Sequence, residues 1–74
     1  MMGKHFILNL YQCDPDLLNN PEYICRALES AAARAGATVL QTICHQFEPQ
    51  GVTAISMLSE SHISIHTWPE KGTA

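Results

Sequence analysis

The chain has 74 residues, of which 46% are hydrophobic and 15% charged, and its formal net charge is −3. A chain of this length accommodates one domain, residues 1–74, with only a small core. Four lysines and arginines are too few for a patch that neutralises phosphates, so nucleic-acid binding is not expected. No run approaches the ~18–20 apolar residues of a membrane span, and no signal peptide is visible, so we expect a cytoplasmic protein with no membrane partner.

The N-terminal third predicts a strand and then a helix. Lys4–Gln12 alternates apolar and polar side chains, which is typical of a strand, and Asp16–Asn19 is compatible with a short helical turn. Asn20 is a good N-cap before a proline at the first helical position, and Gly36 is a good left-handed stop. The apolar stripe of the intervening helix is formed by Ile24, Ala27, Leu28, Ala31 and Ala35.

Three further strands are predicted at Thr38–Phe47, Val52–Ser59 and Ser61–Trp68, with a turn at Glu48–Gly51. The order β-α-β-β-β predicts an α+β fold in which a helix packs on a mostly antiparallel sheet, as a two-layer sandwich. One helix covers only one face of such a sheet. We therefore expect that the domain is incomplete, that a second copy covers the other face, or both.

Neither the cysteines nor the histidines predict a metal site. Cys13, Cys25 and Cys44 are odd in number and include no CxxC pair, which favours three reduced cysteines over a disulfide framework or a zinc ribbon. His62 and His66 are four residues apart, and on a strand this spacing separates them by about 13 Å. Two ligands to one zinc ion must lie much closer together, so no metal is expected.

The run Glu60–Glu70, ESHISIHTWPE, closely resembles the processing-site motif of bacterial and archaeal S-adenosylmethionine decarboxylase proenzymes. The resemblance extends over essentially the whole chain. Its other parts are Gly3–His5, Tyr11–Asp14, Gly36–Thr38 and Phe47–Thr53.

The resemblance implies that the chain makes its own cofactor. The Ser61 hydroxyl would attack the Glu60 carbonyl, and elimination would then cleave the chain and leave a pyruvoyl group at Ser61, in place of pyridoxal phosphate. His66 matches the processing base of the family, and imidazole is the side chain best suited to proton transfer near neutral pH. Thr53 occupies a position at which the family usually has a serine that assists processing, and threonine keeps the hydroxyl.

The resemblance also implies the substrate. The pyruvoyl group would form a Schiff base with the amine of S-adenosylmethionine and accept electrons as CO₂ leaves, yielding the aminopropyl donor for spermidine and other polyamines. Phe47 matches an aromatic platform for adenine, and Glu70 matches an acceptor for the ribose hydroxyls. A pyruvoyl-dependent arginine or ornithine decarboxylase is the alternative substrate class.

Ser61 and His66 are five residues apart, so on a straight strand they stand about 16 Å apart on opposite faces. This spacing favours a homodimer in which His66 and Thr53 of one subunit act on Ser61 of the other. Family members continue beyond Glu70 with a strand that carries a proton-donating cysteine, then a helix and another strand. None of the three cysteines here matches that position, so a truncated relative without catalytic activity remains a further alternative.

Overall fold

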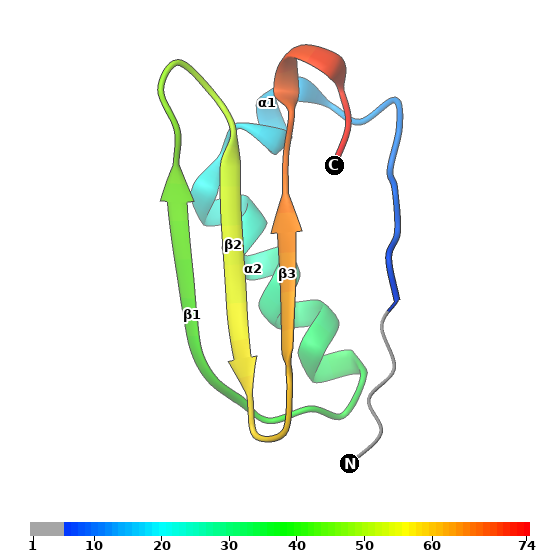
Figure 1. Ribbon diagram of the computed structural model, residues 1–74, viewed down its shortest axis with the longest axis vertical. Helices are drawn as coiled ribbons and strands as arrows, with labels where there is room; N and C mark the ends of the chain where they lie inside the picture. The colour runs from blue at the N-terminus through cyan, green and yellow to red at the C-terminus, as the bar shows by residue number, and fades with distance from the viewer. Residues whose placement is uncertain (1–5) are drawn as a thin grey trace.

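The computed structural model describes residues 6–74, and it confirms the α+β class. Its elements are α1 (Pro15–Leu18), α2 (Pro21–Arg34), β1 (Val39–Gln46), β2 (Val52–Leu58), β3 (His62–His66) and the 3₁₀ turn η1 (Pro69–Lys71). Figure 1 shows α1 and α2 together on one face of a sheet formed by the three strands. None of the helices between residues 6 and 74 has the length and hydropathy needed to cross a membrane.

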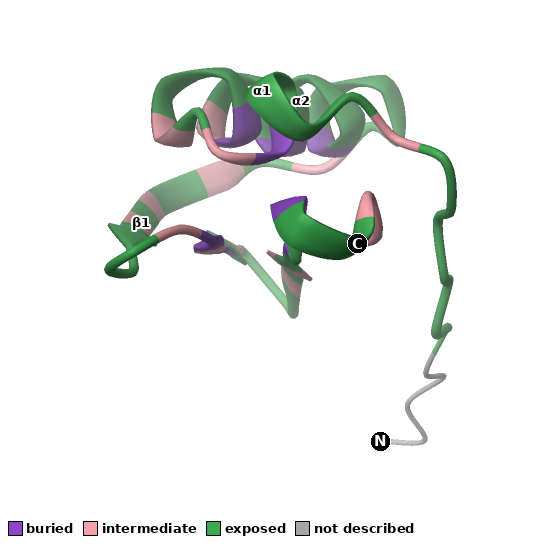
Figure 2. Cartoon of the chain, turned by 90° about the horizontal axis from the view of Figure 1, so that it is seen from above, coloured by how far each residue is buried: buried purple, intermediate pink, exposed green. Residues whose placement is uncertain are grey.

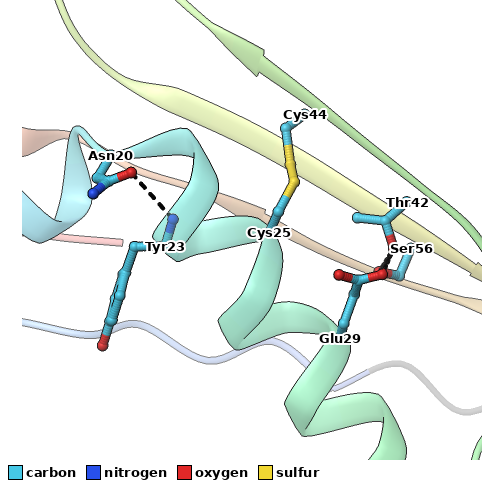
Figure 3. Close-up of a disulfide and its surroundings, with 7 residues drawn as sticks. All are labelled: Asn20, Tyr23, Cys25, Glu29, Thr42, Cys44 and Ser56. Atoms are coloured by element: carbon cyan, nitrogen blue, oxygen red, sulfur yellow. Dashed lines mark hydrogen bonds between the residues drawn. A yellow bond between two sulfur atoms is a disulfide. The ribbon is translucent and has the colours of Figure 1, made fainter.

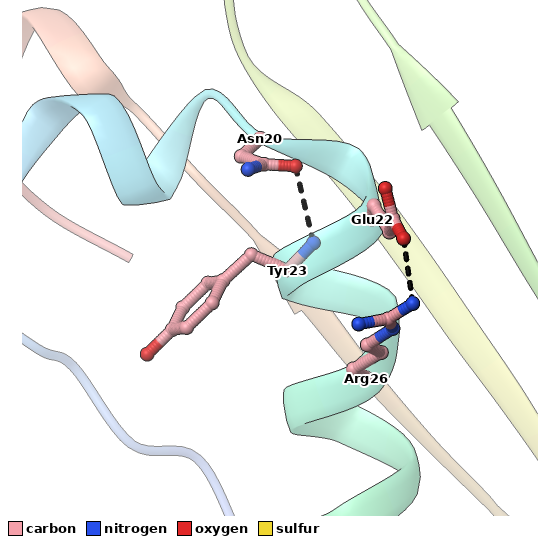
Figure 4. Close-up of polar contacts among 4 residues, drawn as sticks. All are labelled: Asn20, Glu22, Tyr23 and Arg26. Carbon is pink, nitrogen blue, oxygen red and sulfur yellow. Dashed lines mark hydrogen bonds and ion pairs between the residues drawn. The ribbon is translucent and has the colours of Figure 1, made fainter.

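Helix α2 begins and ends where its sequence predicts. The Asn20 side chain accepts a hydrogen bond from the Tyr23 N–H at 3.1 Å (Figure 4). Pro21 occupies the first turn. Glu22 and Arg26 form an ion pair at 2.7 Å one turn apart, but both side chains are exposed, so the pair adds little stability. Gly36 ends the helix with a φ of +78°, a conformation that glycine adopts without strain.

The three strands form one antiparallel sheet in the order β1-β2-β3, with β2 in the centre. Each strand is shorter than its predicted range by one or two residues at one or both ends, and β3 begins at His62 instead of Ser61. In the register, His45 lies opposite Thr53, and Thr53 lies opposite His66. This register aligns one residue of each strand in a row across the sheet.

The core lies between α2 and the sheet. Ile24 and Leu28 of α2 are buried against Val52 and Ala54 of β2, because the helix stripe and alternate residues of the strand face each other. Figure 2 shows the buried residues of α2 on the side of the helix that faces the sheet. Ser56, which is also buried, keeps a hydrogen-bonding partner through a contact of 2.8 Å with the Thr42 hydroxyl of β1.

A disulfide joins α2 to β1, which corrects the prediction of three reduced cysteines. Cys25 and Cys44 are bonded to each other, with Cα atoms 6.4 Å apart, and the bond crosses the layer between helix and sheet (Figure 3). Beside the disulfide, the Thr42 hydroxyl also contacts the Glu29 carboxylate at 3.2 Å. The two cysteines are 19 residues apart in sequence, so counting and local spacing could not reveal that the fold brings them together. Cys13 is free.

The predicted first strand is wrong in its described part, because Phe6–Gln12 is extended or bent chain that joins no ladder. Lys4 and His5, with which the prediction began, lie outside the described residues. A strand requires a hydrogen-bonding neighbour about 4.8 Å away, and Figure 1 shows this segment running apart from β3. It is held at one end, where the Leu10 N–H bonds to the Ala74 carbonyl at 2.8 Å and the Ala74 N–H bonds back at 3.1 Å.

Candidate functional site

One face of the sheet is turned away from α2, and we call it the open face. Because side chains alternate along a strand, it receives the residues between those that face the core. It consists of Gln41, Ile43, His45, Thr53, Ile55, Met57, His62, Ser64 and His66. Ile43, Ile55 and Met57 are 55%, 40% and 47% exposed, respectively. An apolar strip of this kind in the middle of a sheet is typical of a surface that packs against another polypeptide.

A hydroxyl and an imidazole meet at one end of the open face. The Thr53 Oγ1 lies 2.9 Å from the His66 Nδ1, because β2 and β3 place these two residues directly opposite each other. His45 continues the row on the far side of Thr53. The sequence alone assigns no role to His45, because its position beside Thr53 depends on the register of β1 and β2.

The two residues expected to bind substrate lie near the same end of the sheet. Phe47 follows directly after β1 and is half exposed, and its ring packs edge-on against the His45 ring with centroids 4.6 Å apart. Glu70 lies in η1, four residues after His66, with its side chain exposed. Phe47, His45, Thr53 and His66 therefore lie at the end of the sheet where β1 and β3 end. Glu70 lies in the turn that follows β3.

Glu60 and Ser61 lie at the opposite end of β3. They belong to the hairpin turn between β2 and β3, which is closed by a 2.9 Å hydrogen bond from the Leu58 N–H to the Ser61 carbonyl. Both residues are exposed and outside the strand ladder. Along β3, Ser61 and His66 are separated by about 16 Å. Thr53 and His66 are thus in contact, whereas Ser61 of the same chain lies at the other end of β3.

The side chains at the two ends of β3 can carry out proton transfer and nucleophilic attack, respectively. The Thr53–His66 pair can accept or deliver a proton at one point on an exposed surface, since either atom of the contact can act as donor depending on the imidazole tautomer. Ser61 offers a hydroxyl next to a peptide bond that no strand pairing restrains. Within residues 6–74, no cluster of three or more His, Cys, Asp or Glu side chains has the geometry to hold a metal ion.

Comparisons with known proteins agree over almost the whole chain. The family model described as S-adenosylmethionine decarboxylase matches residues 4–74. An S-adenosylmethionine decarboxylase proenzyme from Parasynechococcus marenigrum is 58% identical over 74 residues, which are 100% of this chain and 58% of that protein. Its counterpart from Methanococcus aeolicus is 49% identical over 73 residues, which are 99% of this chain and 62% of that protein.

A solved structure agrees with these sequence matches. The crystal structure of the adenosylmethionine decarboxylase from Aquifex aeolicus superimposes with a TM-score of 0.80 at 43% identity, over 88% of this chain and 53% of that chain. The chain thus spans a little over half the length of the relatives that it matches. A match to the family model over residues 4–74 is decisive: the chain belongs to the S-adenosylmethionine decarboxylase family.

Proposed function

We propose that the chain is the self-processing part of a pyruvoyl-dependent S-adenosylmethionine decarboxylase, a carboxy-lyase of polyamine biosynthesis. The observation that carries this proposal is the Thr53–His66 contact of 2.9 Å on the open face, at the end of the sheet opposite Glu60 and Ser61. The relatives are named proenzymes, which supports a step in which the chain is cut. The hairpin turn is a suitable site for that cut, because its peptide bond is exposed.

The processing step follows from the residues themselves. The Ser61 hydroxyl attacks the Glu60 carbonyl and the peptide nitrogen leaves, so the amide becomes an ester. A base then removes the Ser61 α-proton, and the Glu60 carboxylate departs from the β-carbon, which leaves a dehydroalanine. Addition of water and loss of ammonia convert it to the pyruvoyl group. When formed, this group supplies an electron sink for decarboxylation. We assign the proton-accepting role to His66 and the assisting hydroxyl to Thr53.

The separation of about 16 Å between Ser61 and His66 supports a homodimer with shared sites. If two open faces pack with their strands antiparallel about a two-fold axis, the hairpin of each chain meets the Thr53–His66 end of the other. The exposed Ile43, Ile55 and Met57 side chains lie in the middle of this face, where such packing would bury them. Each site would then combine Ser61 of one chain with His66 and Thr53 of the other.

We propose S-adenosylmethionine as the substrate, with Phe47 as the surface on which adenine stacks and Glu70 as the acceptor for the ribose hydroxyls. Phe47 is half exposed beside His45, so one side of its ring is available to a ligand. Glu70 is exposed in η1 and its carboxylate forms no ion pair among the described residues. An arginine or ornithine substrate would make no evident use of an aromatic platform or a diol acceptor.

The proton donor for decarboxylation is assigned to no residue of this chain. Cys25 and Cys44 are bonded to each other, and Cys13 precedes α1, apart from the open face. We propose that the donor comes from the part of the relatives' length that this chain does not span. The second candidate function is a non-catalytic module that binds a full-length partner or the nucleoside.

Intact mass spectrometry of the purified chain tests the proposal. We expect two fragments that divide between Glu60 and Ser61, the second lighter by one ammonia than a fragment that begins with serine and reactive toward borohydride. The matched control is Ser61→Ala, which keeps the hairpin but lacks the nucleophile and should give one mass. A single uncleaved mass for the natural chain after prolonged incubation would favour the non-catalytic candidate. Release of labelled CO₂ from S-adenosylmethionine, arginine or ornithine then separates the substrate classes.

A further inference from the structure

Strand β1 contributes no fully buried residue to the core. All of its positions from Val39 to Gln46 are half-buried or exposed, whereas alternate residues of β2 from Val52 to Ser56 are buried. β1 also lies at the edge of the described sheet, where β2 is its hydrogen-bonded neighbour. A segment with few buried contacts opens locally more readily than the rest of a fold. The links that attach β1 to the helices therefore determine how firmly it is held.

Hydrogen bonds attach β1 to the helical layer on either side of Cys44. The Thr42 hydroxyl donates to the Glu29 carboxylate of α2 at 3.2 Å. The Gln46 side-chain amide donates to the Asn19 carbonyl, between α1 and α2, at 2.8 Å. Thr42, Cys44 and Gln46 alternate along the strand and therefore share the face toward the helices. Both hydrogen bonds are exposed to water, which competes for the same groups, so each holds β1 only weakly.

The Cys25–Cys44 disulfide lies between these hydrogen bonds and ties β1 to α2 covalently (Figure 3). Cys44 also packs against the apolar core. Both cysteines are half-buried, so neither is sealed inside that core. A disulfide that a thiol can reach undergoes exchange with it, and exposed disulfides belong to the labile class. The firmest link between β1 and the helices is therefore one that a reductant can break.

We propose that Cys25–Cys44 is a reversible thiol–disulfide exchange site that controls how firmly β1 is attached, and that its reductant is a dithiol. One thiolate of the dithiol attacks a sulfur atom of the disulfide, forms a mixed disulfide and releases the other cysteine as a thiolate. The second thiol of the reductant then displaces the first cysteine. The protein gains two electrons and two protons, and the reductant leaves as a cyclic disulfide. This inference does not depend on the proposed function.

The oxidation state of the pair affects the residues that β1 brings to the open face. Ile43 and His45 lie there, and the chain continues directly to Phe47, whose ring packs against the His45 ring. While the disulfide is intact, β1 cannot leave β2 unless α2 leaves the sheet as well, so β1 opens only with the whole fold. After reduction, its ladder with β2 and the exposed hydrogen bonds retain it, and it can open by itself.

Amide exchange distinguishes these two states. The Phe47 N–H bonds to the Gly51 carbonyl, so by alternation the amides of Ile43 and His45 also point toward β2. The amides of Ala54 and Ser56 are the internal control, because they point from β2 toward β3. In the oxidised protein both pairs should be protected to a similar degree.

Reduction with dithiothreitol should separate the two pairs of amides. We expect Ile43 and His45 to exchange faster than Ala54 and Ser56 by about tenfold or more, after correction for intrinsic rates. Oxidised glutathione should restore the similar protection. An equal acceleration of both pairs would overturn the proposal, because the disulfide would then stabilise the fold as a whole without governing β1.

Two cysteine variants provide the controls. Replacing Cys25 and Cys44 together by serine should give the exchange pattern of the reduced protein, with or without dithiothreitol. Cys13→Ser removes the free thiol and should respond to dithiothreitol as the natural chain does. The proposal is overturned if alkylation and mass spectrometry find the pair unbonded in oxidised glutathione, if dithiothreitol reduces it only when the protein is unfolded, or if Cys13→Ser abolishes the response.

Discussion

Thr67 joins the end of β3 to both layers of the fold, and its substitution gives a quantitative test of the structure around His66. The side chain is 6% exposed. Its hydroxyl donates to the Leu18 carbonyl at 2.8 Å and accepts from the Val52 N–H at 2.9 Å. Thr67→Val keeps the shape of the side chain but leaves both buried main-chain groups without this partner. At about 1–3 kcal/mol for each unsatisfied group, the expected loss of unfolding free energy is about 2–6 kcal/mol.

Thr67→Ser is the matched variant, because it keeps the hydroxyl and removes only a methyl group, a loss of about 1 kcal/mol. A 74-residue protein has a total stability of roughly 4–11 kcal/mol, so the two variants should differ clearly. Urea unfolding measures the difference through the fluorescence of Trp68, the single tryptophan and the next residue in the chain. If Thr67→Val unfolds at the same urea concentration as Thr67→Ser or at a higher one, the hydroxyl bridge does not stabilise the fold as argued.

Three further predictions concern the disulfide, the Thr53–His66 pair and the open face. Replacing Cys25 and Cys44 together by serine should lower the unfolding free energy by about 3 kcal/mol in oxidising buffer; an equal melting temperature for both proteins without reductant would contradict it. Thr53→Val should slow cleavage at Glu60–Ser61 by about tenfold or more, while Thr53→Ser should keep the natural rate. Gel densitometry over time measures both rates, and equal rates for the two variants would contradict the prediction. Ile55→Glu should shift the sedimentation coefficient from dimer to monomer, whereas the same change at the exposed Ser30 of α2 should not; an unaltered dimer would remove the open face as the interface.

The parts of the fold that depend on local chemistry were predictable. Asn20, Pro21 and Gly36 define the ends of α2 through a side-chain cap, a preset φ and a left-handed stop, all of which act within a few residues. The strands β2 and β3 follow from their alternation. Phe6–Gln12 alternates in the same way but has no neighbour with which to pair. Strand formation is a property of the pair, and a single sequence carries only one member of it.

In the candidate site too, features set by local spacing were predictable and features set by strand pairing were not. The spacing of Ser61 and His66 along one strand was sufficient to predict that they cannot meet within a chain, and the structure keeps them at opposite ends of β3. The contact of Thr53 with His66, and the position of His45 beside them, depend on strand register, which side-chain period alone does not determine. The disulfide was missed for a related reason, because it depends on how α2 lies over β1.

Mixing two inactive variants tests the shared site most directly. Ser61→Ala chains lack the proposed nucleophile and His66→Ala chains lack the proposed base, so neither should be cleaved when refolded alone. In an equal mixture, about half of the His66→Ala chains pair with a Ser61→Ala partner. Each such dimer contains one site with Ser61 from one chain and His66 from the other. Intact mass spectrometry should then show cleavage of the His66→Ala chain, up to about half of it, and none of the Ser61→Ala chain. A mixture in which the His66→Ala chain stays whole, under conditions that cleave the natural protein, would contradict a site built from two subunits.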